Sequence, residues 1–145
     1  MKRFLSAIIA TILFAIVYSA ISYAPESQRE PNTYYFGFTE TIVFVMLYAG
    51  PVFLLIGIPL SIMIDKSIEN KKSQYIKKLV FYSVAGLLIG ALFPLVLLPG
   101  LNLASLIVLY AGIGLMAANI YFHTFLLLPF SKKNTKKFRE VMRFV

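Results

Sequence analysis

The sequence contains no cysteine and no tryptophan. Without cysteine, the chain forms no disulfide, offers no thiolate to a metal and performs no thiol redox chemistry. Without tryptophan, an aromatic belt at a membrane surface must consist of tyrosine and phenylalanine. Acidic residues are scarce, with 6 Asp and Glu against 14 Lys and Arg, for a net charge of +8. In a soluble protein this excess would suggest nucleic acid binding, but the placement of the charges favours a membrane surface and no nucleic acid.

Charge is absent from four long apolar runs, residues 4–24, 41–64, 79–98 and 103–128. A helix that crosses a bilayer needs about 20 mostly apolar residues, and each run is long enough. The chain is 59% hydrophobic and 14% charged, whereas soluble domains are about 45–50% apolar and about 25% charged. The sequence therefore predicts an all-α integral membrane bundle of four transmembrane helices, with residues 1–145 forming a single domain.

The basic residues predict an orientation. All but one of the 14 Lys and Arg residues lie in the N-terminal segment, in the loop between the second and third runs, or in the tail. Only Arg29 lies in the other loops. By the positive-inside rule, both termini are expected in the cytoplasm of a multi-pass cell-membrane protein. A cleaved signal peptide is the alternative for residues 4–24, but its apolar region would be only about 7–15 residues long.

Small residues predict where the helices pack. Helices in lipid associate through close contact at small residues and through hydrogen bonds, not through a hydrophobic effect. Gly86 and Gly90 form a Gly-x-x-x-Gly motif in the third run, and Gly112 continues a polar stripe in the fourth. Pro99 and Gly100 fit the centre of a tight turn, with Asn102 as a helix cap. We expect a compact antiparallel bundle in which the third and fourth helices form a hairpin.

The second run carries two glycines and two prolines: Gly50, Pro51, Gly57 and Pro59. A proline inside a helix removes one hydrogen bond and clashes with the carbonyl four residues earlier. One interpretation is a broken helix whose free carbonyls line a binding site near the membrane midplane. The favoured interpretation is a kinked, closely packed helix.

Polar residues in and around the runs are few. Asn119 and His123, four residues apart, form a candidate intramembrane polar pair, for pH sensing or for a buried hydrogen bond between helices. Glu40 and Asp65 bracket the second run and are interpreted as boundary residues, with Thr39 as a helix cap. No Asp, Glu, Lys or Arg lies inside a run, although ion-coupled transporters usually need one there. No metal site, cofactor or catalytic set is recognisable.

Two segments outside the runs are expected to contact lipid. Residues 34–38, which read YYFGF, place aromatic rings at the level of the headgroups. Residues 131–145 predict a basic amphipathic helix that docks on an anionic inner leaflet. The same pattern also suits docking to a partner protein.

These features favour a non-catalytic interaction, regulatory or accessory membrane protein that binds another membrane protein or a second copy of itself. The alternative is a small-solute or ion transporter or channel that acts as a homo-oligomer. Small multidrug transporters also have four short helices, but they carry a glutamate inside the first span, and residues 4–24 have none. The polar motifs of four-span fluoride channels also match poorly.

The segment YAGPVFLLIGIPLSIMIDK, Tyr48–Lys66, and the basic N-terminus, middle loop and tail resemble an uncharacterised family. Its members are four-span membrane proteins of Bacillus-type bacteria. The resemblance implies a multi-pass protein in the plasma membrane of a Gram-positive bacterium. It implies no activity and assigns no functional residue.

Overall fold

The computed structural model describes residues 2–68, 74–97 and 103–128, and the regular structure of these residues is helical. The elements are α1 (Lys2–Ser22), a 3-10 turn (Glu26–Gln28), α2 (Phe38–Val52), a π-helical turn (Phe53–Gly57), α3 (Ile58–Ser67), α4 (Gln74–Leu97) and α5 (Leu103–Leu127). Because α2, the π-turn and α3 follow without interruption, they form one long span.

Four helices are long and apolar enough to cross a membrane: Lys2–Ser22, Phe38–Ile68, Tyr75–Leu95 and Ala104–Leu127. This confirms an all-α chain with four candidate spans, with boundaries a few residues from those expected. The orientation of the termini stays a prediction. The expected turn at Pro99 and Gly100, the Asn102 cap and the tail 131–145 lie outside the described residues.

Local chemistry explains where the first two spans begin and end. α1 ends at Ser22, and Pro25 disfavours a helical conformation at the preceding Ala24. α2 begins after Gly37, whose N–H donates to the Glu40 carboxylate at 2.9 Å. Thr39 was expected to cap this helix, and that expectation is wrong because Thr39 lies inside the first turn.

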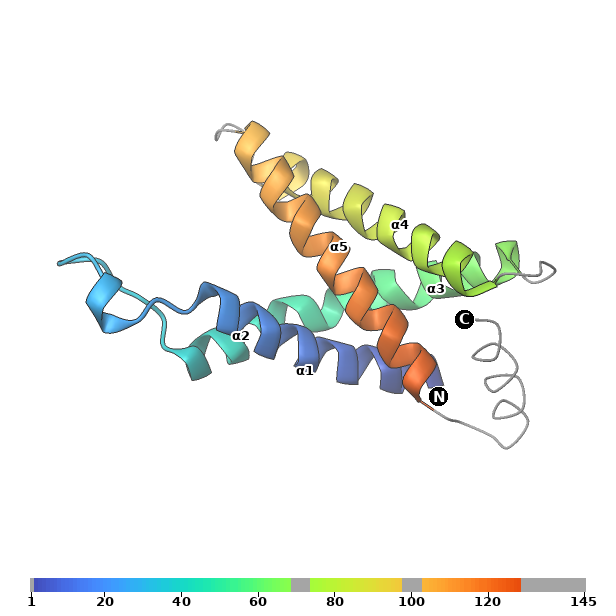
Figure 1. Ribbon diagram of the computed structural model, residues 1–145, viewed down its shortest axis with the longest axis horizontal. Coiled ribbons are helices and arrows are strands. Elements are labelled where there is room, and N and C mark those ends of the chain that lie inside the picture. Colours follow the sequence, from blue (N-terminus) through green and yellow to red (C-terminus); the bar gives the residue numbers. More distant parts are fainter. Residues whose placement is uncertain (1, 69–73, 98–102, 129–145) are drawn as a thin grey trace.

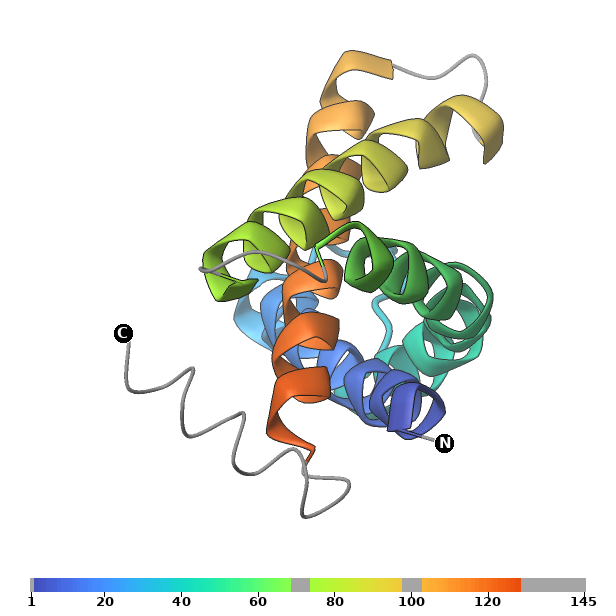
Figure 2. The same ribbon diagram turned by 90° about the vertical axis from the view of Figure 1, so that its right-hand side faces the viewer.

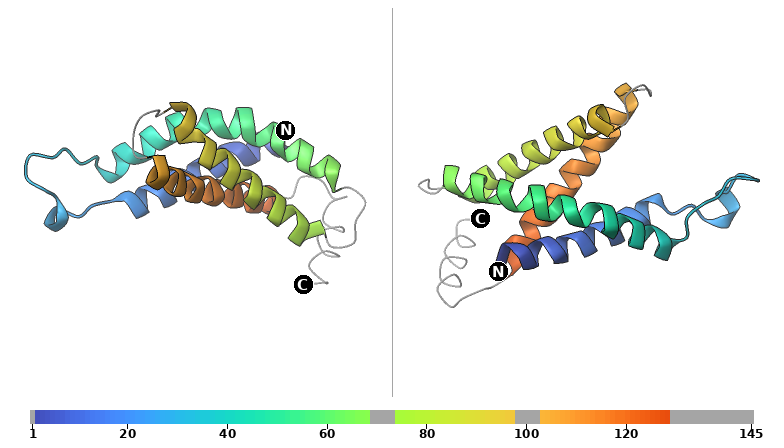
Figure 3. Two further views of the ribbon diagram at one scale, coloured as in Figure 1. Left: turned by 90° about the horizontal axis from the view of Figure 1, so that it is seen from above. Right: turned by 180° about the vertical axis from the view of Figure 1, so that it is seen from behind.

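The helices form two hairpins that converge at one end. The first hairpin is α1 packed against α2 and α3, and the second is α4 packed against α5 (Figure 1). They contact each other through α1 with α5 and through α3 with α4, and they diverge toward the other end (Figures 2 and 3). The expected compact bundle is therefore wrong in one respect, since the hairpins form a wedge.

The second hairpin is built on contact between glycine backbones. A Cβ atom added to Gly86 would overlap the backbone of Gly114, and one added to Gly90 would lie 3.1 Å from the Cα of Ala111. An added Cβ at Gly112 meets nothing within 4 Å. The packing glycine of α5 is therefore Gly114, because residues two apart on a helix point roughly 200° away from each other.

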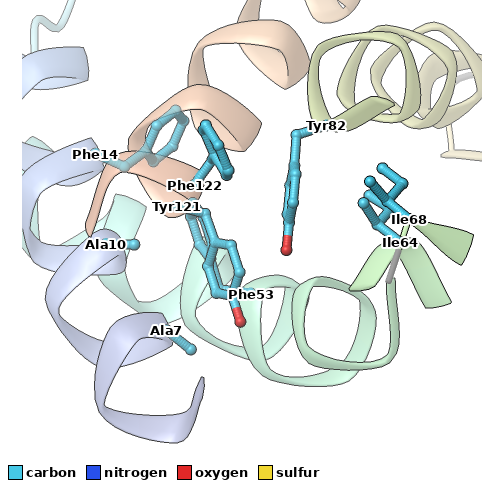
Figure 4. Packing of buried hydrophobic residues seen from close by; sticks show 9 residues of the cluster. All are labelled: Ala7, Ala10, Phe14, Phe53, Ile64, Ile68, Tyr82, Tyr121 and Phe122. Carbon is cyan, nitrogen blue, oxygen red and sulfur yellow. The ribbon is translucent and has the colours of Figure 1, made fainter. Parts of the chain in front are cut away.

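Large aromatic rings fill the space where the hairpins converge. A row of buried rings, here called the ring layer, runs from Phe14 through Phe53 and Tyr121 to Tyr82 (Figure 4). Successive ring centroids are 5.7, 6.2 and 6.2 Å apart. Rings keep helix axes further apart than glycines do, so the hairpins pack less closely with each other than α4 packs with α5.

Candidate functional site

A cleft of about 540 Å³ lies between the hairpins and receives residues from all four spans. Its lining residues are uncharged, and many are aromatic. Tyr48, Phe44 and Phe93 line the cleft while remaining 72%, 46% and 38% exposed, so the cleft is open at its side. Small-molecule pockets typically measure about 300–1,000 Å³. The arrangement suits an apolar occupant that enters from the bilayer.

The π-turn contributes Phe53, Ile56 and Gly57 to the lining of this cleft. Pro59 has no N–H, and in a regular α-helix its ring would clash with the carbonyl of Leu55. Leu55 lies within the π-turn, which ends at Gly57, two residues before the proline. The backbone at Val52, Gly57 and Ile58 has ordinary helical angles, so the span is continuous through the turn. π-turns inside helices occur frequently at functional sites.

Of the four marked positions in this span, only Gly57 lines the cleft. A Cβ added there would lie 3.7 Å from the Tyr121 ring. A Cβ added to Gly50 would lie 3.8 Å from a methyl group of Thr11 on α1. Pro51 and Pro59 are exposed on the outer surface. The two glycines therefore face side chains of different helices, and the prolines face away from the cleft.

Charged residues join the hairpins where they converge. Arg3 of α1 donates to Asp65 of α3 at 2.9 Å, and Lys78 of α4 pairs with the other oxygen of the same carboxylate. These three residues are called the lock, and the end of the molecule that holds them is called the locked end. Their side chains are 34%, 19% and 22% exposed, respectively. Lys2 adds a cation–π contact, with its Nζ 4.4 Å from the centroid of the Phe125 ring.

The other end of the wedge, called the open end, holds its aromatic loop residues against the first hairpin. The rings of Phe36 and Phe44 are 5.1 Å apart, and those of Tyr34 and Phe36 are 5.3 Å apart. The Tyr34 hydroxyl donates to Glu40 at 3.2 Å, and this bond and the carboxylate charge raise the pKa of Tyr34. These contacts order the loop between α1 and α2.

Asn119 and His123 both reach across to α4, at positions outside the cleft lining. The Asn119 amide donates to the Ser83 hydroxyl at 3.2 Å, and the His123 ring contacts the Tyr75 hydroxyl at 3.2 Å. The two side chains bond separately to α4, and His123 Nδ1 lies 2.8 Å from the Asn119 carbonyl oxygen. Their geometry is that of hydrogen bonds within the second hairpin.

Sequence reasoning did not find the lock or the ring layer. A signal for the lock existed, because Arg3, Asp65 and Lys78 each lie next to the end of an apolar run on the side predicted to be cytoplasmic. No periodicity marked the ring layer, because its members come from four separate segments. Within the part of the chain that the structure describes, no group of three His, Cys, Asp or Glu residues is arranged to hold a metal.

No protein family, curated protein or solved structure that we compared with this chain matches it. The resemblance of Tyr48–Lys66 to an uncharacterised four-span family therefore stays an expectation.

Proposed function

We propose that this chain is a non-catalytic interaction protein of the cell membrane, and that its cleft accepts an apolar transmembrane helix of a partner protein. The observation that carries the proposal is the open, uncharged, aromatic cleft between the hairpins. An uncharged lining offers nothing to an ion or a charged substrate, but it suits side chains that already reside in lipid.

The dimensions of the cleft support a helix that lies along its mouth. A helix with its side chains is about 10–12 Å across, so side chains from one face would enter the 540 Å³ while the other face stayed in lipid. Ala49, Gly57 and Ala117 in the lining are small enough to admit a neighbouring helix closely. The aromatic residues around them supply large contact areas.

The expected orientation fits this role. With the termini in the cytoplasm, the lock and the basic tail lie at the inner leaflet, where anionic lipids attract Lys and Arg. The cleft then opens toward the outer half of the bilayer. The occupant is a membrane-embedded helix, and no cofactor is required.

A cross-linking experiment in native membranes tests the proposal. A photoreactive amino acid placed at Tyr48, 72% exposed and in the cleft lining, should cross-link to a protein. The matched control is Leu55 in the same long span, which is 75% exposed and outside the lining. We expect one defined protein adduct from position 48 that is absent at position 55. Lipid adducts alone at both positions would contradict the proposal, and an adduct of twice the chain mass would identify the partner as a second copy.

Transport of a small solute by a homo-oligomer is the second candidate, and one observation favours it. The hairpins diverge at the open end and are joined by the lock at the other end, as expected of a carrier that is open to one side of the membrane. Passage would require Lys78 to part from Asp65. Solute flux into liposomes that increases in Asp65→Asn would favour transport over the interaction role.

A further inference from the structure

Three buried hydroxyl groups from three helices lie near one another, and two of them belong to tyrosines of the ring layer. Ser61 on α3 is 0% exposed, and Tyr82 on α4 and Tyr121 on α5 are each 2% exposed. The Ser61 hydroxyl lies close enough to interact with the phenol groups of both tyrosines, without the distance and angle of a direct hydrogen bond. Figure 4 shows the two phenol oxygens directed toward the first hairpin. Within the described part of the chain, none of the three oxygens has a hydrogen-bond partner.

Ser61 lacks the local hydrogen bond that most helical hydroxyls make, and among the described residues it shares this with Ser19 on α1. Serine and threonine in helices commonly donate to the carbonyl four residues earlier. Side chains that do so, at 2.7–3.0 Å, include Ser6, Thr11, Ser22, Thr41, Ser67 and Thr124. Ser61 does not bond to the Gly57 carbonyl, which belongs to the π-turn. Its hydroxyl is therefore available to a partner between the helices.

A buried hydroxyl without a partner loses its hydrogen bonds to solvent and gains nothing in return. Three such groups at one place are unusual, because buried polar atoms in native proteins are nearly always hydrogen-bonded. A single small molecule between the three oxygens would satisfy all of them. The arrangement is thus that of a binding site made of neutral groups that can both donate and accept.

We propose that Ser61, Tyr82 and Tyr121 hold a water molecule that joins α3, α4 and α5 beneath the cleft. Buried waters typically make two to four hydrogen bonds, and these hydroxyls supply three. Asp65 of the lock lies one helical turn beyond Ser61, so the partly exposed lock gives water a short route to the site. An ion is a poorer occupant, because Arg3 and Lys78 already share the only carboxylate of the lock.

Whether Tm falls or rises when each hydroxyl is removed tests this site. If a water bridges the hydroxyls, Tyr82→Phe, Tyr121→Phe and Ser61→Ala should each lower Tm in detergent by roughly 3 °C, because each leaves the water short of a partner. If the hydroxyls hold nothing, each change removes an unsatisfied group and Tm should rise. Tyr110→Phe is the matched control, since Tyr110 lines the cleft outside this trio, and its Tm should stay unchanged.

Pairwise combinations distinguish a shared water from direct hydrogen bonds. With one shared water, every pair of variants should lower Tm by less than the sum of its single variants. If Ser61 bonded directly to one tyrosine, only that pair would be coupled and replacing the other tyrosine by Phe would raise Tm, which would overturn the proposal.

Solid-state NMR in deuterated lipid bilayers gives the direct observation. Magnetisation should pass from water to the rings of Tyr82 and Tyr121, and it should weaken at both rings when Ser61 is replaced by Ala. Absence of water contact at both rings in the unaltered protein would refute the site whatever the Tm values show.

Discussion

The locked end and the open end differ in the contacts that the two hairpins make. Contacts join the hairpins at the locked end, and contacts stay within each hairpin at the open end. At the locked end, Asp65 of the first hairpin pairs with Lys78 of the second, and Lys2 lies over the ring of Phe125. Further along the spans, Phe53 stacks on Tyr121. At the open end, each described contact stays within one hairpin: the Tyr34–Glu40 bond and the rings of the loop lie in the first, and Phe93 stacks on Tyr110 in the second. Polar and aromatic contacts thus fix the angle between the hairpins at one end, and the other end is left free to admit a neighbour.

This difference follows from where polar groups are tolerated. Ion pairs at the ends of the candidate spans keep partial access to water, so Arg3, Asp65 and Lys78 avoid the full cost of burial. Inside the bilayer, contact between helices depends on small residues and shape. The second hairpin has glycines at its crossing, whereas the two hairpins meet through rings. Close packing of glycines therefore holds the two helices of the second hairpin together, and the lock holds the two hairpins together.

The largest expected effect comes from replacing the glycines that bring α4 and α5 together. Gly86→Leu combined with Gly90→Leu should destabilise the protein by on the order of 4 kcal/mol, because each side chain would overlap a facing backbone. Thermal unfolding in detergent measures it. Gly112→Leu is the control, since a Cβ there meets nothing within 4 Å. Equal melting temperatures for the double variant and the control would show that this crossing does not hold the hairpin.

A smaller effect is expected from opening the lock. Asp65→Asn leaves two cations without their shared carboxylate and should cost about 2 kcal/mol, less than for a fully buried pair because the side chains are partly exposed. Spin labels on cysteines introduced at Lys66 and Leu127 report the locked end, and labels at Val43 and Val108 report the open end. The distance distribution at the locked end should broaden toward that of the open end.

The control for the lock is Glu40→Gln at the open end. It removes a charge that bonds within the first hairpin, so the distribution between positions 66 and 127 should stay unchanged. Equal broadening in both variants would mean that loss of any carboxylate loosens the fold, and the lock would have no special role.

The smallest effect concerns the pH response of the open end. The Tyr34 phenol donates to Glu40, and its pKa is raised by that bond and by the carboxylate charge. Near pH 10, the ordinary pKa of tyrosine, Tyr34 should be less ionised in the unaltered protein than in Glu40→Gln. Tyrosinate absorbance, with Tyr34→Phe to identify the signal, measures the difference. An identical titration in both proteins would show that the bond is not formed in solution.

Much of the fold was predictable because lipid imposes simple rules. Runs of about 20 uncharged residues must be helices that satisfy their own backbone groups, and the four candidate spans match that expectation. The candidate site was harder to predict from the sequence. Gly57 was marked for its place beside Pro59, but nothing in the linear pattern showed that its neighbour Phe53 would join Phe14 and Tyr121 in the ring layer.

The sequence by itself determined the number of candidate spans, the glycines available for packing and the placement of charge at the ends of the apolar runs. The tertiary structure alone decided which charges meet at Asp65, that Gly114 and not Gly112 faces the third span, and that the hairpins diverge around a cleft. The physical reason is that hydropathy and helical period act along one chain segment. Crossing angles and shared pockets depend on how side chains from separate segments fill a common volume.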